Sequence, residues 1–185
     1  LAARHVPGLQ WRVIVTSILT ITVTILPGFL PGALAVQLSE SLGIAEAGIG
    51  LIVGGFFGVS ALASSRLGRL VERLDWASAT RVAALGAAAT LLLTPLLGRS
   101  VIMLGLVTVA GGLALALAHP AVNLGIARCT PAARQGLAFG FKHAAIPAAT
   151  AIAGLGLPIV AIPLGWQWVY VMCAALAVIA ALLVP

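Results

Sequence analysis

The sequence predicts an all-α membrane protein, a bundle of six transmembrane helices. Its mean hydropathy is +1.19, and only 8% of the 185 residues are charged. Apolar runs of about 20 residues recur along the chain, and each is long enough to cross the roughly 30 Å of hydrocarbon in a bilayer. Basic residues gather in alternate connections between these runs, as expected for a chain that threads a membrane repeatedly.

The apolar runs place the six spans in order along the chain. We expect them at residues 13–36, 47–65, 79–97, 101–127, 136–162 and 167–184. The first run is too long for a signal peptide and continues into a polytopic pattern. The chain starts at Leu1 without a methionine and stops at Pro185 directly after an apolar run, so we expect residues 1–185 to be one domain of a longer protein.

The charges predict the direction of threading. One set of alternate ends carries eight arginines: Arg4, Arg12, Arg66, Arg69, Arg73, Arg81, Arg128 and Arg134. The other set carries only Arg99, and its first connection holds Glu40 and Glu46. Because basic residues are retained in the cytoplasm, we predict a multi-pass protein of the cell (inner) membrane with a cytoplasmic amino terminus.

Several function classes do not fit this pattern. Despite the net charge of +6, the sequence has no basic stripe with interleaved aromatics, so we expect no nucleic-acid partner. No Ser–His pair has a carboxylate partner, and no metal-ligand spacing appears. We therefore expect no catalytic residues, no metal and no cofactor, and an intramembrane enzyme is only a remote alternative.

Small residues mark one face of the second span. Gly50, Gly54 and Gly58 recur at four-residue spacing and form a smooth stripe that lets another helix backbone approach closely. The approaching helix could belong to this chain or to the rest of a longer protein. The sequence leaves both possibilities open.

Three threonines, Thr16, Thr20 and Thr24, share one face of the first span, just before Pro27 and Pro31. Their hydroxyl groups could bond to carbonyls of their own helix. Alternatively, this polar face lines a water-filled cavity, and the prolines allow the helix to bend.

Three ionisable residues fall inside spans, where they are costly and therefore candidates for function. His119 in the fourth span and Lys142 and His143 in the fifth share a depth of about 10–13 Å below the cytoplasmic surface. No Asp or Glu lies within a span, so the local field is positive and favours an anionic substrate. Lys142 is the best candidate for direct contact, and Asn123, one turn from His119, can add hydrogen bonds.

These residues also have ordinary structural interpretations. Lys142 can extend to the cytoplasmic interface. His119 precedes Pro120 and can bond to a carbonyl that the proline frees. Because Lys142 and His143 are adjacent, their side chains point about 100° apart and cannot both face one cavity squarely.

The connection after the second span resembles a family signature. Residues 68–75 read Gly-Arg-Leu-Val-Glu-Arg-Leu-Asp, which resembles the segment between helices two and three of the major facilitator superfamily. Gly68, Glu72 and Arg73 match, whereas the second glycine and the further basic residues are replaced by Asp75, Trp76 and Ala77. The resemblance implies that Gly68 ends a helix and that the segment is a conformational latch, held by paired charges in one state.

A second resemblance covers the fifth span. Gly140, Lys142 and Pro147 resemble a pattern of the cyanate-permease-like branch of this superfamily. The fourth span lacks the arginine that many members use in proton coupling, and the fifth-helix motif of drug–proton antiporters is degenerate around Pro147. Both departures argue against a conventional drug exporter.

The superfamily resemblance implies one half of a 12-helix fold, built from two inverted three-helix repeats. It implies a secondary active transporter that moves a small solute by alternating access, with the substrate between two six-helix halves. The expected partners are a small-molecule substrate, an anion by the field argument, the lipid bilayer and a missing carboxy-terminal half. The alternative is a small six-helix protein that dimerises into a pore or carrier.

Overall fold

The computed structural model describes residues 7–185, so Arg4 lies outside the described part of the chain. Within that part the chain is helical, with no strand, and six runs of helix are long and apolar enough to cross a membrane. The all-α six-span prediction is therefore confirmed. Four spans are single helices: α1 (Pro7–Ala33), α3 (Glu46–Arg73), α4 (Trp76–Leu97) and α5 (Val101–Cys129).

The fifth span consists of several consecutive helical segments, and the sixth span is a single shorter helix. The fifth consists of α6 (Ala132–His143), α7 (Ala145–Gly156), the π-helical turn η1 (Leu157–Ala161) and α8 (Ile162–Leu164). The sixth is α9 (Trp166–Leu183), which follows a turn at Gly165, where φ is +101° and a side chain would be strained. A short helix that the sequence analysis missed, α2 (Ala35–Leu42), lies between α1 and α3.

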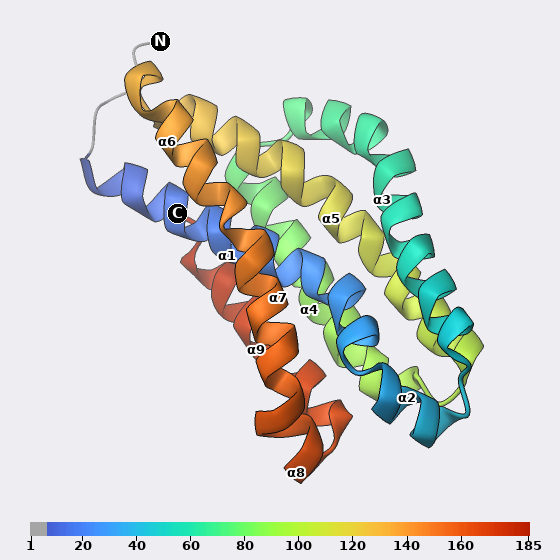
Figure 1. Cartoon of the computed structure of the whole chain (residues 1–185). Helices are drawn as coiled ribbons and strands as arrows, with labels where there is room; N and C mark the ends of the chain where they lie inside the picture. Colours follow the sequence, from blue (N-terminus) through green and yellow to red (C-terminus); the bar gives the residue numbers. More distant parts are fainter. Residues whose placement is uncertain (1–6) are drawn as a thin grey trace.

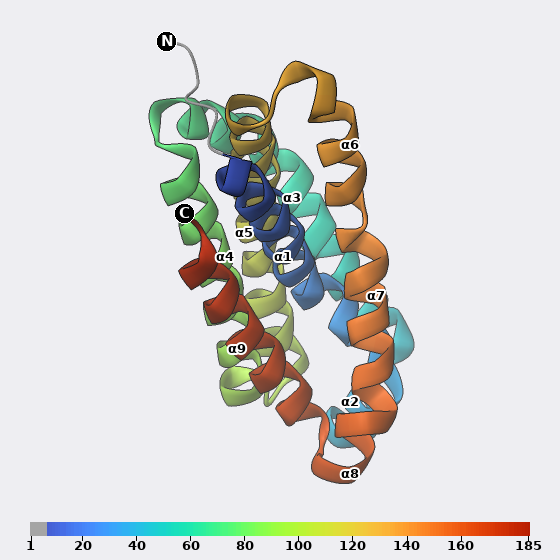
Figure 2. The same ribbon diagram turned by 90° about the vertical axis from the view of Figure 1, so that its left-hand side faces the viewer.

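The helices run up and down the bundle, so alternate connections gather at the same end (Figures 1 and 2). The α3–α4 and α5–α6 connections, which carry most of the arginines, lie at one end, and α2 and α8 lie at the other. This arrangement agrees with the alternation of charge that the sequence showed. A bundle with this threading and this hydropathy is a multi-pass membrane protein.

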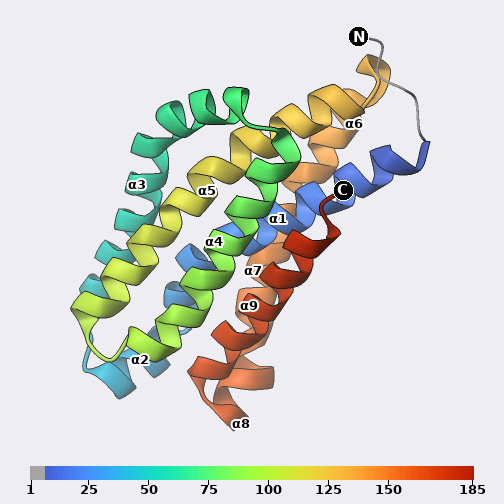
Figure 3. The same cartoon turned by 180° about the vertical axis from the view of Figure 1, so that it is seen from behind.

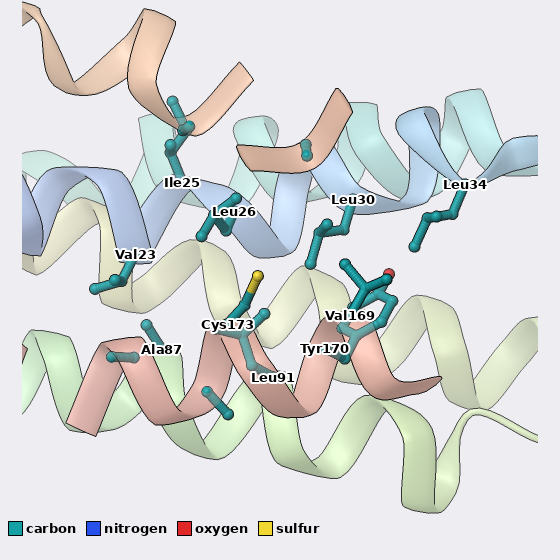
Figure 4. Packing of buried hydrophobic residues seen from close by; sticks show 14 of the residues in the cluster. Val23, Ile25, Leu26, Leu30, Leu34, Ala87, Leu91, Val169, Tyr170 and Cys173 are labelled. Atoms are coloured by element: carbon teal, nitrogen blue, oxygen red, sulfur yellow. The ribbon is translucent and has the colours of Figure 1, made fainter. Parts of the chain in front are cut away.

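Helix α1 lies at the centre of the bundle and contacts α3, α4, α5, α7 and α9. Viewed from behind, α4 and α9 lie side by side, with α1 behind them (Figure 3). Figure 4 shows Leu30 of α1 beside Val169 and Tyr170 of α9, and Leu26 of α1 near Cys173 of α9, all within one buried cluster. These buried contacts hold α1 in the centre of the bundle, and the other spans pack around it.

Helices α3 and α5 approach each other closely because glycine faces backbone at their crossing. A Cβ atom at Gly112 would collide with the carbonyl oxygen of Phe56. A small residue at this point lets the two backbones pack without an intervening side chain. The close contact between α3 and α5 therefore uses Gly112 rather than the predicted stripe on α3.

The end of the second span differs most from the sequence prediction. Helix α3 continues to Arg73, eight residues beyond the expected end of the second span, so Gly68 lies inside a helix and does not end one. The break comes at Leu74, because Asp75 caps α4 by accepting a hydrogen bond from the Ala77 amide at 3.2 Å. Hydropathy predicts where a helix leaves the hydrocarbon, whereas the capping residue decides where the helix stops.

Candidate functional site

The candidate site lies where α5 and α6, antiparallel neighbours in the chain, face each other. Lys142, near the end of α6, is only 5% exposed. Its Nζ atom donates a hydrogen bond of 2.8 Å to Oδ1 of Asn123 on α5. The lysine therefore does not extend to the interface in this structure but stays inside the bundle, tied to a neutral amide.

The helix is interrupted directly after Lys142. The amide of Ala144 bonds to the carbonyls of Phe141 and Lys142, and a new helix, α7, begins at Ala145. Pro147 has no N–H to offer to the carbonyl of His143, four residues earlier, which favours a break at this point. Irregular backbone at membrane depth is tolerated where it is buried in protein or lines a cavity. The break thus sets Lys142 at a helix end inside the span.

Thr22 of α1 supports the break from the other side, which the sequence analysis did not foresee. Its hydroxyl donates to the carbonyl of Ala145 at 3.3 Å. Thr22 lies two residues from both Thr20 and Thr24, so it stands on a different face of α1 from the predicted stripe and does not continue the four-residue spacing of that stripe. Only the position of the broken helix reveals its role.

His119 and His143 are the other two titratable groups near Lys142. His119 on α5 is half-buried and forms no hydrogen bond among the described side chains, so the expected bond to a freed carbonyl is not seen. Lys142 and His143 are the ionisable groups close enough to act on it. His143 is exposed and Lys142 is buried, as their roughly 100° separation on the helix predicts.

No acidic group balances this cluster. The four acidic residues of the sequence lie at Glu40, Glu46, Glu72 and Asp75, all near helix ends or outside the spans. The cluster therefore combines one ammonium, two imidazoles and an amide at a break in a membrane helix. An anion would supply the missing negative charge.

The three threonines of the predicted cavity-lining stripe are buried within this half. Thr16 donates to the Arg12 carbonyl at 2.8 Å, and Thr24 donates to the Thr20 carbonyl at 2.8 Å. These are the bonds to the helix backbone that the sequence left open as one interpretation. The Thr20 hydroxyl is buried and has no partner among the described residues. A role for the stripe in a cavity stays a prediction.

The glycine stripe on α3 faces outward. Gly50, Gly54 and Gly58 are exposed, and a Cβ atom added to any of them would meet nothing within 4 Å. The side of the molecule near this stripe also carries a shallow cavity of about 400 Å³ between α1, α3 and α7. It is lined by Gly28, Phe29, Gly32, Ala33, Val53, Thr150, Ala153 and Gly154. This surface of small and apolar residues is open in the described chain.

The predicted latch residues lie on the last turns of α3. Glu72 and Arg73 are exposed, and no ion pair joins them to each other or to another described residue. Glu72 stands at the carboxy-terminal end of α3, so the acidic group at a helix amino terminus is Asp75 instead. The latch role of Gly68, Glu72 and Arg73 stays a prediction.

Metal binding has no support in the described part of the chain, where no three His, Cys, Asp or Glu residues lie close enough together to hold an ion. Cys129 and Cys173 are both free thiols.

Comparison with known proteins agrees with this description. A family model described as Major Facilitator Superfamily matches residues 13–185. The chain is also 32% identical over 195 residues to a protein of Mycolicibacterium smegmatis (strain ATCC 700084 / mc(2)155) named "MFS-type efflux pump". That alignment covers 99% of this chain but only 43% of the relative, so the chain spans less than half the length of the protein it matches. Neither match distinguishes the cyanate-permease-like branch, which stays a prediction.

Proposed function

Because this chain belongs to the major facilitator superfamily, we propose that it is the amino-terminal half of a secondary transporter that moves a small organic anion by alternating access. Transporters built from structural repeats hold their substrate near the bilayer midplane at the interface between the repeats. Six helices with an open, glycine-rich face supply one side of such a site. The matching side comes from the missing carboxy-terminal half.

The bond between Lys142 and Asn123 is the observation that carries this proposal. A buried ammonium without a carboxylate partner is costly, and residues of this kind inside membrane spans are conserved for function rather than for stability. The single amide acceptor leaves two of the three N–H donors of the ammonium free for an anion. Lys142 is the proposed contact to the substrate, with Asn123 orienting it.

The histidines have secondary proposed roles at the same site. His119 is half-buried and unbonded among the described side chains, so it is free to take up or release a proton as an anion binds and leaves. His143 is exposed on the surface of this half. Because it is adjacent to Lys142, its side chain projects from a different side of the helix, and it can contact a ligand only from that side. We propose Lys142 as the primary contact and the histidines as supporting charges.

Gly50, Gly54 and Gly58 are proposed to pack against the missing half, since nothing in the described chain covers them. Gly68, Glu72 and Arg73 are proposed as the latch, since Glu72 and Arg73 are exposed and have no ion-pair partner in the described part of the chain. A partner that meets these charges in only one conformation would bias the equilibrium between conformations.

The proposed setting is the cell (inner) membrane, with the arginine-rich end of the bundle in the cytoplasm. The related protein of M. smegmatis is named an efflux pump, which favours export as the direction. The arginine missing from the fourth span and the degenerate motif around Pro147 argue against a conventional drug exporter.

The test is transport by the full-length protein with Lys142 replaced. Proteoliposomes would be loaded with a panel of radiolabelled mono- and dicarboxylates, and efflux would be followed for the wild type, Lys142→Ala and Lys142→Arg. We expect Lys142→Ala to lower anion transport at least about tenfold, because it removes the charge that binds the substrate. Lys142→Arg should retain part of the activity.

Arg134→Gln is the matched control, because it removes an exposed cation at the same end of the bundle. Its transport should equal that of the wild type. Undiminished transport by Lys142→Ala, in a protein that is purified in the same yield and unfolds at the same temperature, would overturn Lys142 as the substrate contact.

A further inference from the structure

Arg81 differs from the neighbouring arginines in its contacts. It lies in the second turn of α4, and its Nη2 atom donates hydrogen bonds to the carbonyls of Val184 at 2.8 Å and Pro185 at 3.2 Å. These carbonyls follow α9, and Val184 is 103 residues further along the chain. Arg66 and Arg73 of α3, by contrast, form no hydrogen bond or ion pair with another described residue. The sequence counted Arg81 only as a topology signal, whereas the structure gives it a specific partner.

The end of α9 needs a donor from another helix. The last carbonyl groups of a helix have no partner within the helix and carry a partial negative charge. Helix α9 has no basic residue in its last turn, and the backbone leaves the helical conformation at Val184, where ψ is 125°. A guanidinium group near such an end donates charge-assisted hydrogen bonds to the carbonyls. Arg81 therefore supplies from α4 the cation that α9 does not carry itself.

The packing of α4 against α9 brings Arg81 close to these carbonyls. The two helices contact each other, and in Figure 2 the end of α9, marked C, lies beside α4. Small residues of both helices belong to one buried cluster: Ala84 of α4 and Ala177, Ala180 and Ala181 of α9. Small side chains let helices approach closely, and Val184 is itself only 2% exposed. The bond thus closes an interface that is already tightly packed.

This bond also joins the two groups of three spans. Counted in threes, α4 is the last span of the first group, and α9 is the last span of the second. In the proposed transporter, the residues after α9 lead into the connection to the missing half. Because Arg81 binds backbone carbonyls, it fixes the path of the main chain at this point whichever side chains follow.

We propose that Arg81 is a positioning residue for transport, which clamps the end of α9 to α4 and so fixes the direction in which the connection leaves the bundle. This inference rests on the proposed function, because it needs a second half that moves relative to this one. A fixed exit makes the connection turn with the whole six-helix unit when the halves change their relative orientation. Arg81 lies on α4, whereas the proposed anion contact, Lys142, lies on α6.

Hydrogen–deuterium exchange of the full-length protein tests the clamp. In Arg81→Gln we expect the amides of residues 180–184 to exchange at least about fivefold faster, because a hydrogen bond from a charged donor is lost and the last turn of α9 opens more often. Arg81→Lys should keep part of the protection, since an ammonium can still donate to a carbonyl. Arg66→Gln, which removes an exposed arginine at the same end of the bundle, is the matched control and should leave this exchange unchanged.

Transport of the carboxylate panel by the same variants tests the positioning role. We expect Arg81→Gln to lower the maximal rate at least about fivefold and to leave the half-saturating anion concentration unchanged, since the contact at Lys142 is intact. Arg81→Lys should restore part of the rate. The exchange measurement needs no substrate, so it judges the clamp even if none of these carboxylates is transported.

Three results would overturn the proposal. The first is unchanged exchange at residues 180–184 in Arg81→Gln, and the second is exchange that rises throughout α4 and α9, as a general loss of packing would cause. The third is a normal maximal rate in a variant whose last turn of α9 exchanges faster. An equal effect of Arg66→Gln would likewise contradict a specific clamp and attribute the result to net charge.

Discussion

At the scale of single residues, the account depends on one buried lysine and its partner. The 2.8 Å bond places the charge of Lys142 next to a neutral amide rather than a carboxylate. An amide holds the ammonium in position without neutralising it, so the attraction for an anion is preserved. The identity of residue 123 therefore matters as much as the presence of the lysine.

Replacing Asn123 with aspartate tests this point directly. Asn123→Asp keeps the size and the acceptor but adds a negative charge beside Lys142. We expect anion transport to fall at least about tenfold, because an internal ion pair competes with the substrate. The folded protein should be at least as stable as the wild type. Unchanged transport of the carboxylate panel would contradict the proposed role of the free ammonium.

His119 is tested by the pH dependence of transport. In His119→Gln the side chain cannot change its charge, so any proton step that this histidine carries is removed. We expect the transport rate of this variant to lose its dependence on pH between about 5 and 8. His143→Gln, which alters an exposed histidine in the same cluster, should keep the profile of the wild type. A profile in His119→Gln that matches the wild type would rule out His119 as a proton carrier.

The sequence revealed much of this cluster but not its support. Counting from the α5–α6 connection placed His119, Lys142 and His143 at one depth, and the structure brings them within electrostatic reach of one another. Thr22 was not predictable, because its partner is the Ala145 carbonyl at a break 123 residues away in the chain. A polar residue that supports the backbone of a distant helix leaves no periodic pattern in its own segment.

At the scale of the helices, the glycines form two groups: some pack against another helix of this chain, and others face open space. Gly112 of α5 meets the Phe56 carbonyl inside this half, whereas Gly54 of α3 meets nothing within 4 Å. The two positions therefore predict different consequences for the same kind of substitution.

Gly112→Leu should destabilise the six-helix chain itself by roughly 1–3 kcal/mol, because the new side chain forces α3 and α5 apart. Gly54→Leu should leave the unfolding temperature of this chain unchanged. In the full-length protein, however, it should lower transport at least about fivefold, the effect of roughly 1 kcal/mol at a contact between the halves. Thermal unfolding of the six-helix chain and transport by the full-length variants measure the two effects. Destabilisation of the six-helix chain by Gly54→Leu would show that the stripe packs internally.

Hydropathy predicted that six spans exist but not where their helices end. Helix α3 runs on to Arg73 because charged residues are good helix formers outside the hydrocarbon, and the stop is set by the cap at Asp75. Neither the short helix α2 nor the break after His143 was predicted. Both depend on local backbone geometry at Leu34 and Ala144, which apolar composition does not encode.

At the scale of the whole molecule, the chain has the threading of one half of a major facilitator fold. Its arginine-rich connections lie at one end of the bundle, as Figures 1 and 2 show. The depth of Lys142, His119 and His143 and the position of the proposed latch are both measured from that end. The account therefore depends on which side of the membrane this end faces.

Labelling of single cysteines in intact cells is the most direct test. Cys129 and Cys173 would be replaced by alanine in the full-length protein, and one cysteine would be introduced at the exposed position of Glu40 or Ala133. We predict that a membrane-impermeant maleimide labels Glu40→Cys in intact cells but labels Ala133→Cys only after lysis. Labelling of Ala133→Cys in intact cells, with Glu40→Cys protected, would contradict the proposed orientation of the transporter.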